Sequence, residues 1–179
     1  MTYDFRTLKN NLEKKGYKVA VFDNKEAATK YLDSQIDGRT VGFGGSVTLR
    51  EMNLFELLSK HNTVYSHENK PENMTVAEAR TVAARSDIYI SSVNGISEDG
   101  VIVNIDNTGN RVAAISYGPQ KVYLVTGGNK LAKDYEAALF RARNIAAPLN
   151  AKRLNRKTPC AVNGEKCYDC NSPERICRN

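Results

Sequence analysis

The sequence predicts an α/β protein with an open, mostly parallel sheet, helices on both faces of the sheet and one antiparallel hairpin. Strand-like and helix-like segments alternate as far as residue 91, which implies parallel strands joined by helical crossovers. An Asn-Gly and an Asp-Gly dipeptide then mark a hairpin. The 179 residues, 41% of them hydrophobic, suit one α/β domain of residues 1–148 followed by an irregular, cysteine-rich tail of residues 149–179.

The elements of the first half follow from apolar spacing and from two capping patterns. Apolar residues at helical spacing predict a first helix that Gly16 ends, and a second one after Asn24. A threonine followed three positions later by glutamate predicts two further helix starts, at Thr48–Glu51 and Thr75–Glu78. The expected strands are 17–22, 40–43, 62–65 and 87–91.

The second half adds the hairpin, a further strand and a helix. Turn residues separate the hairpin strands, and a Gly-Gly pair ends the strand that follows them. The expected elements are hairpin strands at 101–105 and 112–116, a strand at 121–126 and a helix over about 132–145. From Pro148 onward apolar periodicity disappears, so the tail needs something other than an apolar core to hold it.

Composition and charge exclude several classes of protein. No apolar run approaches the roughly 20 residues of a membrane helix, and the first residues lack a signal-peptide pattern, so we expect a cytoplasmic protein with no membrane partner. Residues 151–179 hold seven basic and three acidic side chains, a net +4 of the total +6. No aromatic-rich basic stripe accompanies this excess, which disfavours nucleic-acid binding. The basic residues would instead offset negative charge within the same segment, which contains all four cysteines of the chain.

The four cysteines carry the strongest functional signal. Their spacing is Cys160-x₆-Cys167-x₂-Cys170-x₆-Cys177, and such a group in the cytosol more often binds metal or does redox chemistry than forms disulfides. Iron–sulfur clusters use four cysteines at loose spacing, whereas structural zinc usually takes two close pairs. The interpretation is a [4Fe–4S] cluster, with Zn²⁺ and free or redox-active thiols as alternatives. The bound metal would supply the folding free energy that the tail lacks.

Two glycine-rich segments follow predicted strands. Gly44 to Thr48 lies between a strand and a helix start, where backbone N–H groups favour a phosphate or carboxylate. A tight turn that requires positive φ would account for the glycines as well. Gly127 to Lys130 repeats the pattern and adds a lysine, which could hold an anion, act as a base or simply lie on the surface. The candidate binding residues are Gly44, Gly45, Ser46, Thr48, Asn94, Gly128 and Asn129.

Two adjacent carboxylates near the hairpin are candidates for proton transfer. Glu98 and Asp99 face opposite ways if they lie on a strand, so at most one points into a given pocket. Turn chemistry is the alternative explanation for Asp99 and for Asn94. If the protein is catalytic, Glu98 or Asp99 would move a proton and Lys130 would stabilise negative charge.

Several segments combine into a family resemblance. They are residues 44–51, 94–100, 104–114, 118–122 and 128–130, followed by the Thr158-Pro159-Cys160 to Cys177 segment. The chain resembles the LUD-domain family, also called the lactate utilisation protein C-like family, and its tail looks like the cysteine-bearing extension of small stand-alone members. The resemblance implies an open sheet similar to those of ribose-phosphate isomerases, glucosamine-phosphate deaminases and CoA transferases. It also implies that residues 44–48 and 128–130 line one pocket, with Glu98-Asp99-Gly100 as a polar wall.

The resemblance implies a role in the oxidation of L-lactate to pyruvate alongside iron–sulfur partner proteins. The leading hypothesis is a protein of lactate or organic-acid use that binds a small anionic or phosphorylated metabolite at the strand ends and a cluster at the tail. A rival hypothesis is a non-catalytic electron-transfer or scaffolding subunit, in which the glycine loops are only turns. A third is a phosphosugar isomerase or hydrolase. A homo-oligomer is left open.

Overall fold

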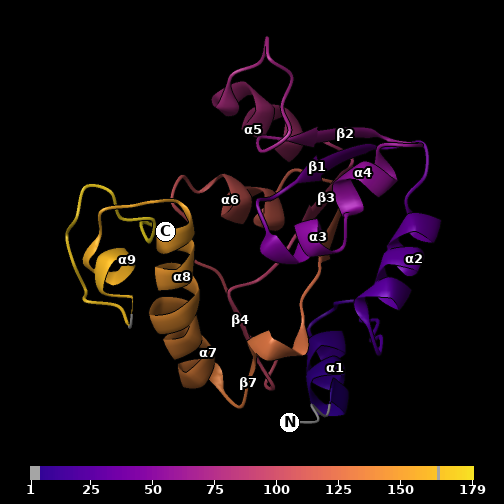
Figure 1. The fold of residues 1–179 in the computed structure, drawn as a ribbon. Helices are drawn as coiled ribbons and strands as arrows, with labels where there is room; N and C mark the ends of the chain where they lie inside the picture. Colours follow the sequence, from indigo (N-terminus) through magenta and orange to yellow (C-terminus); the bar gives the residue numbers. More distant parts are fainter. Residues whose placement is uncertain (1–4, 165) are drawn as a thin grey trace. The chain divides into compact units, whose positions relative to one another are not determined.

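The computed structural model describes residues 5–164 and 166–179 (Figure 1). The chain divides into two compact units. Unit 1 consists of the described residues up to Ala20, residues 93–109 and residues 127–179. Unit 2 consists of residues 21–92 and 110–126. No helix among the described residues is both long and apolar enough to cross a membrane.

Unit 2 is built on a parallel sheet with the strand order β2-β1-β3-β6 (Figure 1). All three strand pairings are parallel, and Gly42 of the central strand β1 lies opposite Tyr65 on one side and Tyr89 on the other. The strands are β1 (Thr40–Phe43), β2 (Thr63–Ser66), β3 (Ile88–Ser91) and β6 (Lys121–Leu124). These four strands confirm the mostly parallel sheet that the sequence predicts.

Helices cover both faces of this sheet because its side chains alternate between two apolar cores. Val41 and Ile90 pack with leucines of α2, α3 and α4, whereas Tyr89 packs with Ala83 of α5 and Ala114 of α6. The helices are α2 (Lys25–Gln35), α3 (Val47–Glu51), α4 (Leu54–Leu58), α5 (Val76–Ala84) and α6 (Asn110–Ser116). The predicted capping box of Thr75 and Glu78 begins α5.

Unit 1 contains a mixed sheet of order β5-β4-β7, in which β4 pairs antiparallel with β5 and parallel with β7. Val103 of β5 packs with Ala138 and Ala142, which lie in the successive helical elements α7 and η2. The remaining elements are α1 (Phe5–Lys14), β4 (Gly95–Ser97), β5 (Ile102–Val103), the 3₁₀ turn η1 (Gly128–Lys130), β7 (Leu131–Ala132), α7 (Tyr135–Arg141), the π-helical η2 (Ala142–Ala146), α8 (Ala147–Arg153) and α9 (Pro159–Asn163).

Two predicted strands are wrong. Residues 112–116 form helix α6 instead of a hairpin strand, because a short apolar run fits either element and a helix lets Ala114 reach the core. The hairpin consists of β4 and β5 instead. Residues 17–22 form no strand, although their sequence is strand-like, because no neighbouring strand pairs with them.

Two helices have different limits from those predicted. The helix expected from Thr48 is capped by Ser46, and it is divided into α3 and α4 at Asn53, whose φ is 51°. The helix expected to end near residue 145 widens into η2 just before Pro148 and continues as α8 to Arg153. The first part of the predicted irregular tail is therefore helical and buries Ala151.

Candidate functional site

Four cysteines of unit 1 share one cavity. Cys160 lies in α9, Cys167 and Cys170 in the loop that follows, and Cys177 near Asn179. All four are free thiols, and all four line a cavity of about 360 Å³. The tail therefore brings together the four cysteines that the sequence singles out.

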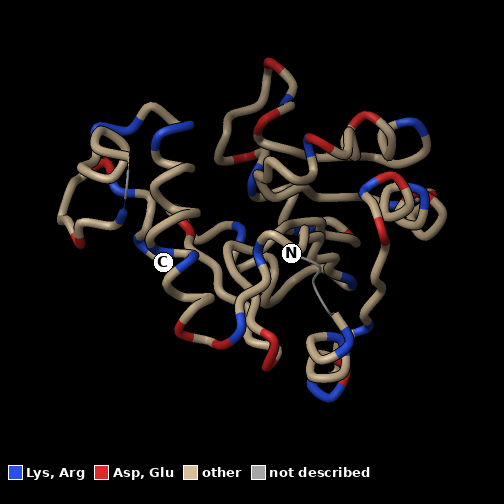
Figure 2. The backbone as a smooth tube through the Cα atoms, turned by 60° about the horizontal axis from the view of Figure 1, so that its bottom comes forward, with Lys and Arg blue, Asp and Glu red and all other residues tan. Residues whose placement is uncertain are grey.

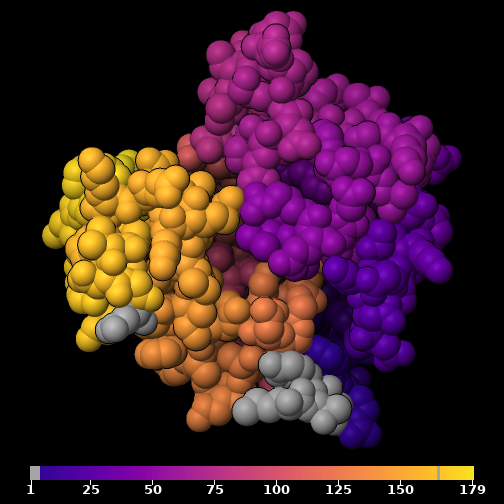
Figure 3. Space-filling model, viewed as in Figure 1, coloured from indigo at the N-terminus to yellow at the C-terminus, as the bar shows by residue number. Residues whose placement is uncertain are grey.

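Apolar side chains and main-chain hydrogen bonds hold the tail around this cavity. Figure 3 shows the tail in yellow against the orange helices α7 and α8. Asp106 and Asn179 exchange two main-chain hydrogen bonds, of 2.9 and 3.0 Å. The N–H of Cys167 donates to the Asn144 side chain at 3.1 Å. The apolar lining includes Val103, Ile105, Leu139, Ala147, Ala151 and Ile176.

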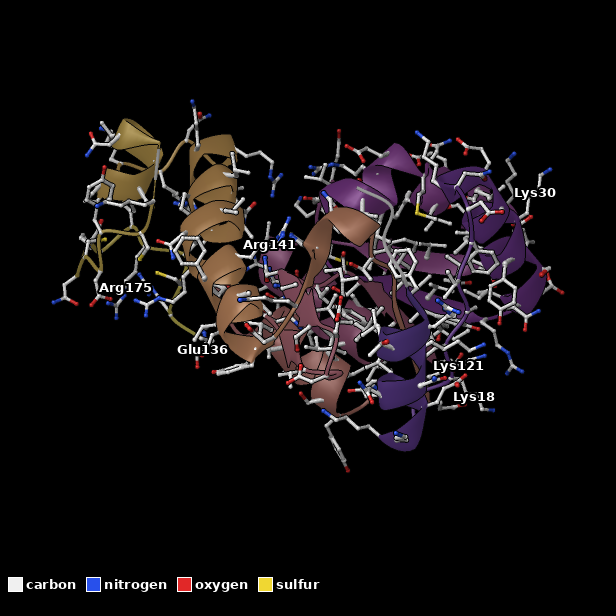
Figure 4. All side chains as sticks on the ribbon, turned by 90° about the horizontal axis from the view of Figure 1, so that it is seen from below. Lys18, Lys30, Lys121, Glu136, Arg141 and Arg175 are labelled. Carbon is white, nitrogen blue, oxygen red and sulfur yellow. The ribbon has the colours of Figure 1, made fainter. Side chains whose placement is uncertain are left out.

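Two arginines line the cavity beside the thiols. Arg143 of η2 forms a 2.7 Å ion pair with Asp169, and Arg175 donates to the main-chain oxygen of Cys170 at 3.5 Å. Figure 4 labels Arg175 within the tail, where sulfur atoms are drawn yellow, and Figure 2 shows the basic residues of the tail in blue. Arg175 belongs to the basic segment 151–179, whose excess of positive charge is visible in the sequence. Arg143 lies outside that segment, so the sequence did not single it out.

The thiols perturb one another and their neighbours. Cys177 is exposed as a residue, but it lines the cavity with the other three cysteines. Partial burial is the largest cause that raises the pKa of its thiol, and the charge of the nearby Cys167 is the second. A hydrogen bond to Cys167 is the largest cause that raises the pKa of Arg143. The N–H of Asp169 also lies 3.4 Å from the Cys167 sulfur. Within residues 5–164 and 166–179, no three Cys, His, Asp or Glu side chains are grouped closely enough to hold a single metal ion.

The first glycine loop lies at the carboxyl edge of the sheet in unit 2. In the strand order β2-β1-β3-β6, the connections leave β1 and β3 in opposite directions, and ligands of open α/β sheets bind at such a switch point. Gly44 directly follows β1, and its N–H donates to Ile90 of β3 at 2.9 Å. This loop therefore occupies the position where such folds bind ligands.

Close contacts require a glycine at position 44 and leave limited space at position 45. Neither Gly44 nor Gly45 has a positive φ, so the alternative explanation of these glycines by a positive-φ turn is wrong. A Cβ atom at Gly44 would lie 2.7 Å from the Ser91 hydroxyl oxygen, and one at Gly45 would lie 3.3 Å from the His67 ring. The backbone thus approaches polar side chains of the neighbouring strands.

The polar residues of this loop have local roles. Ser46 accepts from the N–H of Leu49 at 3.4 Å and caps α3, and Thr48 lies within that helix. Sequence reasoning missed the buried serines at the ends of the adjacent strands, Ser66, Ser91 and Ser92. Their only signal in the sequence is that each ends or follows a predicted strand.

In unit 1, Arg141 of α7 holds the other predicted loops together. Its Nε donates to the main-chain oxygen of Asn129 at 2.9 Å, and its Nη1 donates to the main-chain oxygen of Asn94. Figure 4 labels this side chain. Gly128 to Lys130 form η1, directly before the β7 strand that pairs with β4. Sequence reasoning missed Arg141, because a helical arginine gives no sign of the two loops that it joins.

The two candidate acids lie at the turn between β4 and β5. The N–H of Glu98 donates to the main-chain oxygen of Ala132 at 2.9 Å, while the carboxylate of the exposed Asp99 accepts from the hydroxyl of the buried Ser97. The Asn94 side chain also serves the hairpin and accepts from Ile105 at 2.9 Å. Turn chemistry therefore accounts for Asp99, whereas the Asn94 side chain bonds to a residue 11 positions away in the sequence. The pocket expected between residues 44–48 and 128–130 stays a prediction, because these loops belong to different units.

Comparison with known proteins gives one family. Neither a curated protein nor a solved structure matches the chain. The LUD domain matches residues 5–179, which covers all the segments quoted above and the cysteine tail. The chain belongs to the LUD-domain family.

Proposed function

We propose that this protein is an iron–sulfur protein of organic-acid oxidation, with a [4Fe–4S] cluster held by Cys160, Cys167, Cys170 and Cys177. Family membership supports a role in lactate or organic-acid utilisation in broad terms. The observation that carries the cluster is the single cavity of about 360 Å³ that all four thiols line. The proposal places the protein in the cytoplasm, where thiols stay reduced.

The size of the shared space favours a cluster over zinc. A zinc ion would need four sulfur atoms about 2.3 Å from one point. In a [4Fe–4S] cluster each cysteine binds a different iron atom, so the sulfur atoms surround a larger volume. Four thiols around one cavity suit the second arrangement, and the loose spacing of their sequence suits it as well.

The residues around the cavity would each have a defined role. A bound cluster supplies one-electron transfer. The arginines Arg143 and Arg175 would offset its negative charge, and both line the cavity. The apolar residues Leu139 and Ile176 would limit the access of water. The C-terminal pairing of Asp106 with Asn179 would keep Cys177 in place.

The cluster is tested by elemental analysis of the full chain purified without oxygen. We expect about four iron and four sulfide per chain, with a broad absorption near 400 nm that dithionite bleaches. Replacing Cys167 with serine should lower the iron content, whereas Ser172→Ala, in the same tail but outside the cavity lining, should retain it. A colourless protein with stoichiometric zinc and no iron would contradict the proposal.

A small anionic or phosphorylated metabolite is the second part of the proposal. The position of Gly44, Gly45, Ser46 and Thr48 at the switch point of the unit 2 sheet supports it. If the protein is catalytic, Glu98 or Asp99 would move a proton and Lys130 would stabilise negative charge. The alternatives are a scaffolding or electron-transfer subunit that docks iron–sulfur partner proteins, and an isomerase or hydrolase of phosphosugars.

Substitutions distinguish these functions. A thermal-shift screen of carboxylates and sugar phosphates should find a ligand whose stabilising effect is lost in Ser46→Ala and Thr48→Ala. The exposed variant Ser59→Ala should keep that effect. Stabilisation by lactate or a related acid supports the leading function, and stabilisation by a sugar phosphate supports the isomerase or hydrolase. If no compound stabilises the wild-type protein, the scaffolding function is favoured.

A further inference from the structure

Thr158 is an unusually buried polar residue beside the cysteine cavity. Its side chain is 1% exposed, it lines the cavity, and its hydroxyl lies 3.3 Å from the sulfur of Cys160. In the part of the chain that the structure describes, this sulfur is the only hydrogen-bond partner of the hydroxyl. Buried hydroxyl groups are almost always hydrogen-bonded, so the contact with the Cys160 sulfur is the hydrogen bond that satisfies this hydroxyl.

Thr158 stands just before helix α9, where a threonine hydroxyl usually bonds to the main chain of the helix. It is the N-cap of α9, and at this position the hydroxyl ordinarily accepts a hydrogen bond from a main-chain N–H of the first turn. Ser46 and Thr75 cap α3 and α5 in that way. Thr158 makes no side-chain cap bond, and its hydroxyl lies beside Cys160 instead.

We propose that the Thr158 hydroxyl donates a hydrogen bond to the cysteinyl sulfur of Cys160 and thereby raises the reduction potential of the cluster. This inference rests on the proposed cluster. A thiolate bound to iron has no proton, so the hydroxyl must be the donor. Thr158 is thus a positioning residue that acts through Cys160 without binding iron.

The direction of the effect follows from charge. One-electron reduction changes the net charge of a core with four thiolates from about −2 to about −3, and a donor stabilises the more negative state more strongly. The burial of Thr158 places this bond in a medium of low dielectric constant, which strengthens it. At a second thiol, Cys167, the neighbours are the main-chain N–H of Asp169 and the side chain of Arg143. At Cys160 the neighbour is a side-chain hydroxyl, which a single substitution removes.

The test is a redox titration of the full-length holoprotein, followed by electron paramagnetic resonance. Thr158→Val replaces the hydroxyl with a methyl group of similar size, and we expect a shift to a more negative potential. Thr158→Ser keeps the hydroxyl and should stay near the wild-type value. Thr75→Val is the matched control, because it removes a threonine N-cap of unit 2 and should leave the potential unchanged.

The outcomes separate this inference from the cluster itself. A wild-type protein without iron and sulfide contradicts the proposed function. A wild-type cluster whose potential is the same in Thr158→Val contradicts the role of Thr158 alone. If the valine variant loses the cluster, Thr158→Ala is the second variant, and a more negative potential there supports the inference. If both variants lose the cluster while the serine variant keeps it, the hydroxyl is needed for assembly, and the tuning role is wrong.

Discussion

Unit 2 and the cysteine tail are held in place by different kinds of contact. Both faces of the unit 2 sheet are covered by apolar side chains, and residues such as Leu54 and Ile90 have no exposed surface. Within residues 154–164 and 166–179 of the tail, Thr158 and Ile176 are the buried side chains. Burial of apolar side chains therefore accounts for the order of unit 2, whereas main-chain hydrogen bonds to Asp106 and a few apolar contacts hold the tail, and the proposed cluster would hold it further.

The largest expected effect is the release of the tail when the cluster is removed. Treatment of the holoprotein with oxygen and a chelator should abolish the slow hydrogen exchange of residues 156–179, because binding free energy is folding free energy in such segments. Amides of β1 and β3 should stay protected. The measurement is hydrogen exchange by mass spectrometry before and after removal. Unchanged protection of the tail, with its thiols unliganded, would contradict the comparison.

The core of unit 2 should respond strongly to a cavity. Leu54→Ala removes a fully buried side chain and should lower the free energy of unfolding by about 2–5 kcal/mol. The same substitution at Leu149 of α8, which is 61% exposed, should change it by less than about 0.5 kcal/mol. Urea denaturation of the three proteins makes the comparison. A small loss in Leu54→Ala would mean that burial does not hold unit 2.

Close packing of strands against helices provides the next effect. A Cβ atom at Gly42 would lie 2.0 Å from the main-chain oxygen of Ala83 in unit 2, and one at Gly95 would lie 2.6 Å from that of Ala138 in unit 1. Gly42→Ala should destabilise its unit by about 3 kcal/mol, and Gly95→Ala by less. Gly45→Ala, whose nearest contact is 3.3 Å, is the tolerant control. Equal midpoints of urea denaturation in Gly42→Ala and Gly45→Ala would contradict this ranking.

The sequence predicts the parts of the fold whose signals are local. The strands β1 and β3 read as short apolar runs, and the capping box of Thr75 and Glu78 marks α5 without any tertiary information. The errors at 17–22 and 112–116 have a common cause. In both segments the local pattern fits a strand, and only the presence or absence of a partner strand decides the outcome.

The candidate site residues also divide into those with a local signal in the sequence and those whose role depends on tertiary contacts. The cysteines could be found because four of them lie within a short stretch of chain. Thr158 and Arg141 could not be found, because their partners are set by tertiary packing: Arg141 joins two loops that lie 47 and 12 residues away. Ordinary residue types at structural positions give no sign of such roles in the sequence.

The smallest expected effect is a pH dependence confined to unit 2. His61 lies 2.9 Å from an Asp33 oxygen and 3.1 Å from an Asp37 oxygen. The hydrogen bond to Asp33 is the largest cause that raises the pKa of His61 above its usual value of about 6.5. Because the folded pKa is raised, the stabilisation is complete below about pH 6.5 and is lost as the pH rises through the folded value.

Urea denaturation between pH 5.5 and 8.5 measures this loss. Wild-type unit 2 should become slightly less stable as the pH rises, and His61→Gln should remove that slope because the neutral side chain binds no proton. His67→Gln, at the end of β2, is the matched control and should keep the slope. The tail should show no such dependence on His61, since the histidine and its two carboxylates all lie in unit 2. A slope that persists in His61→Gln would assign the titration to another group.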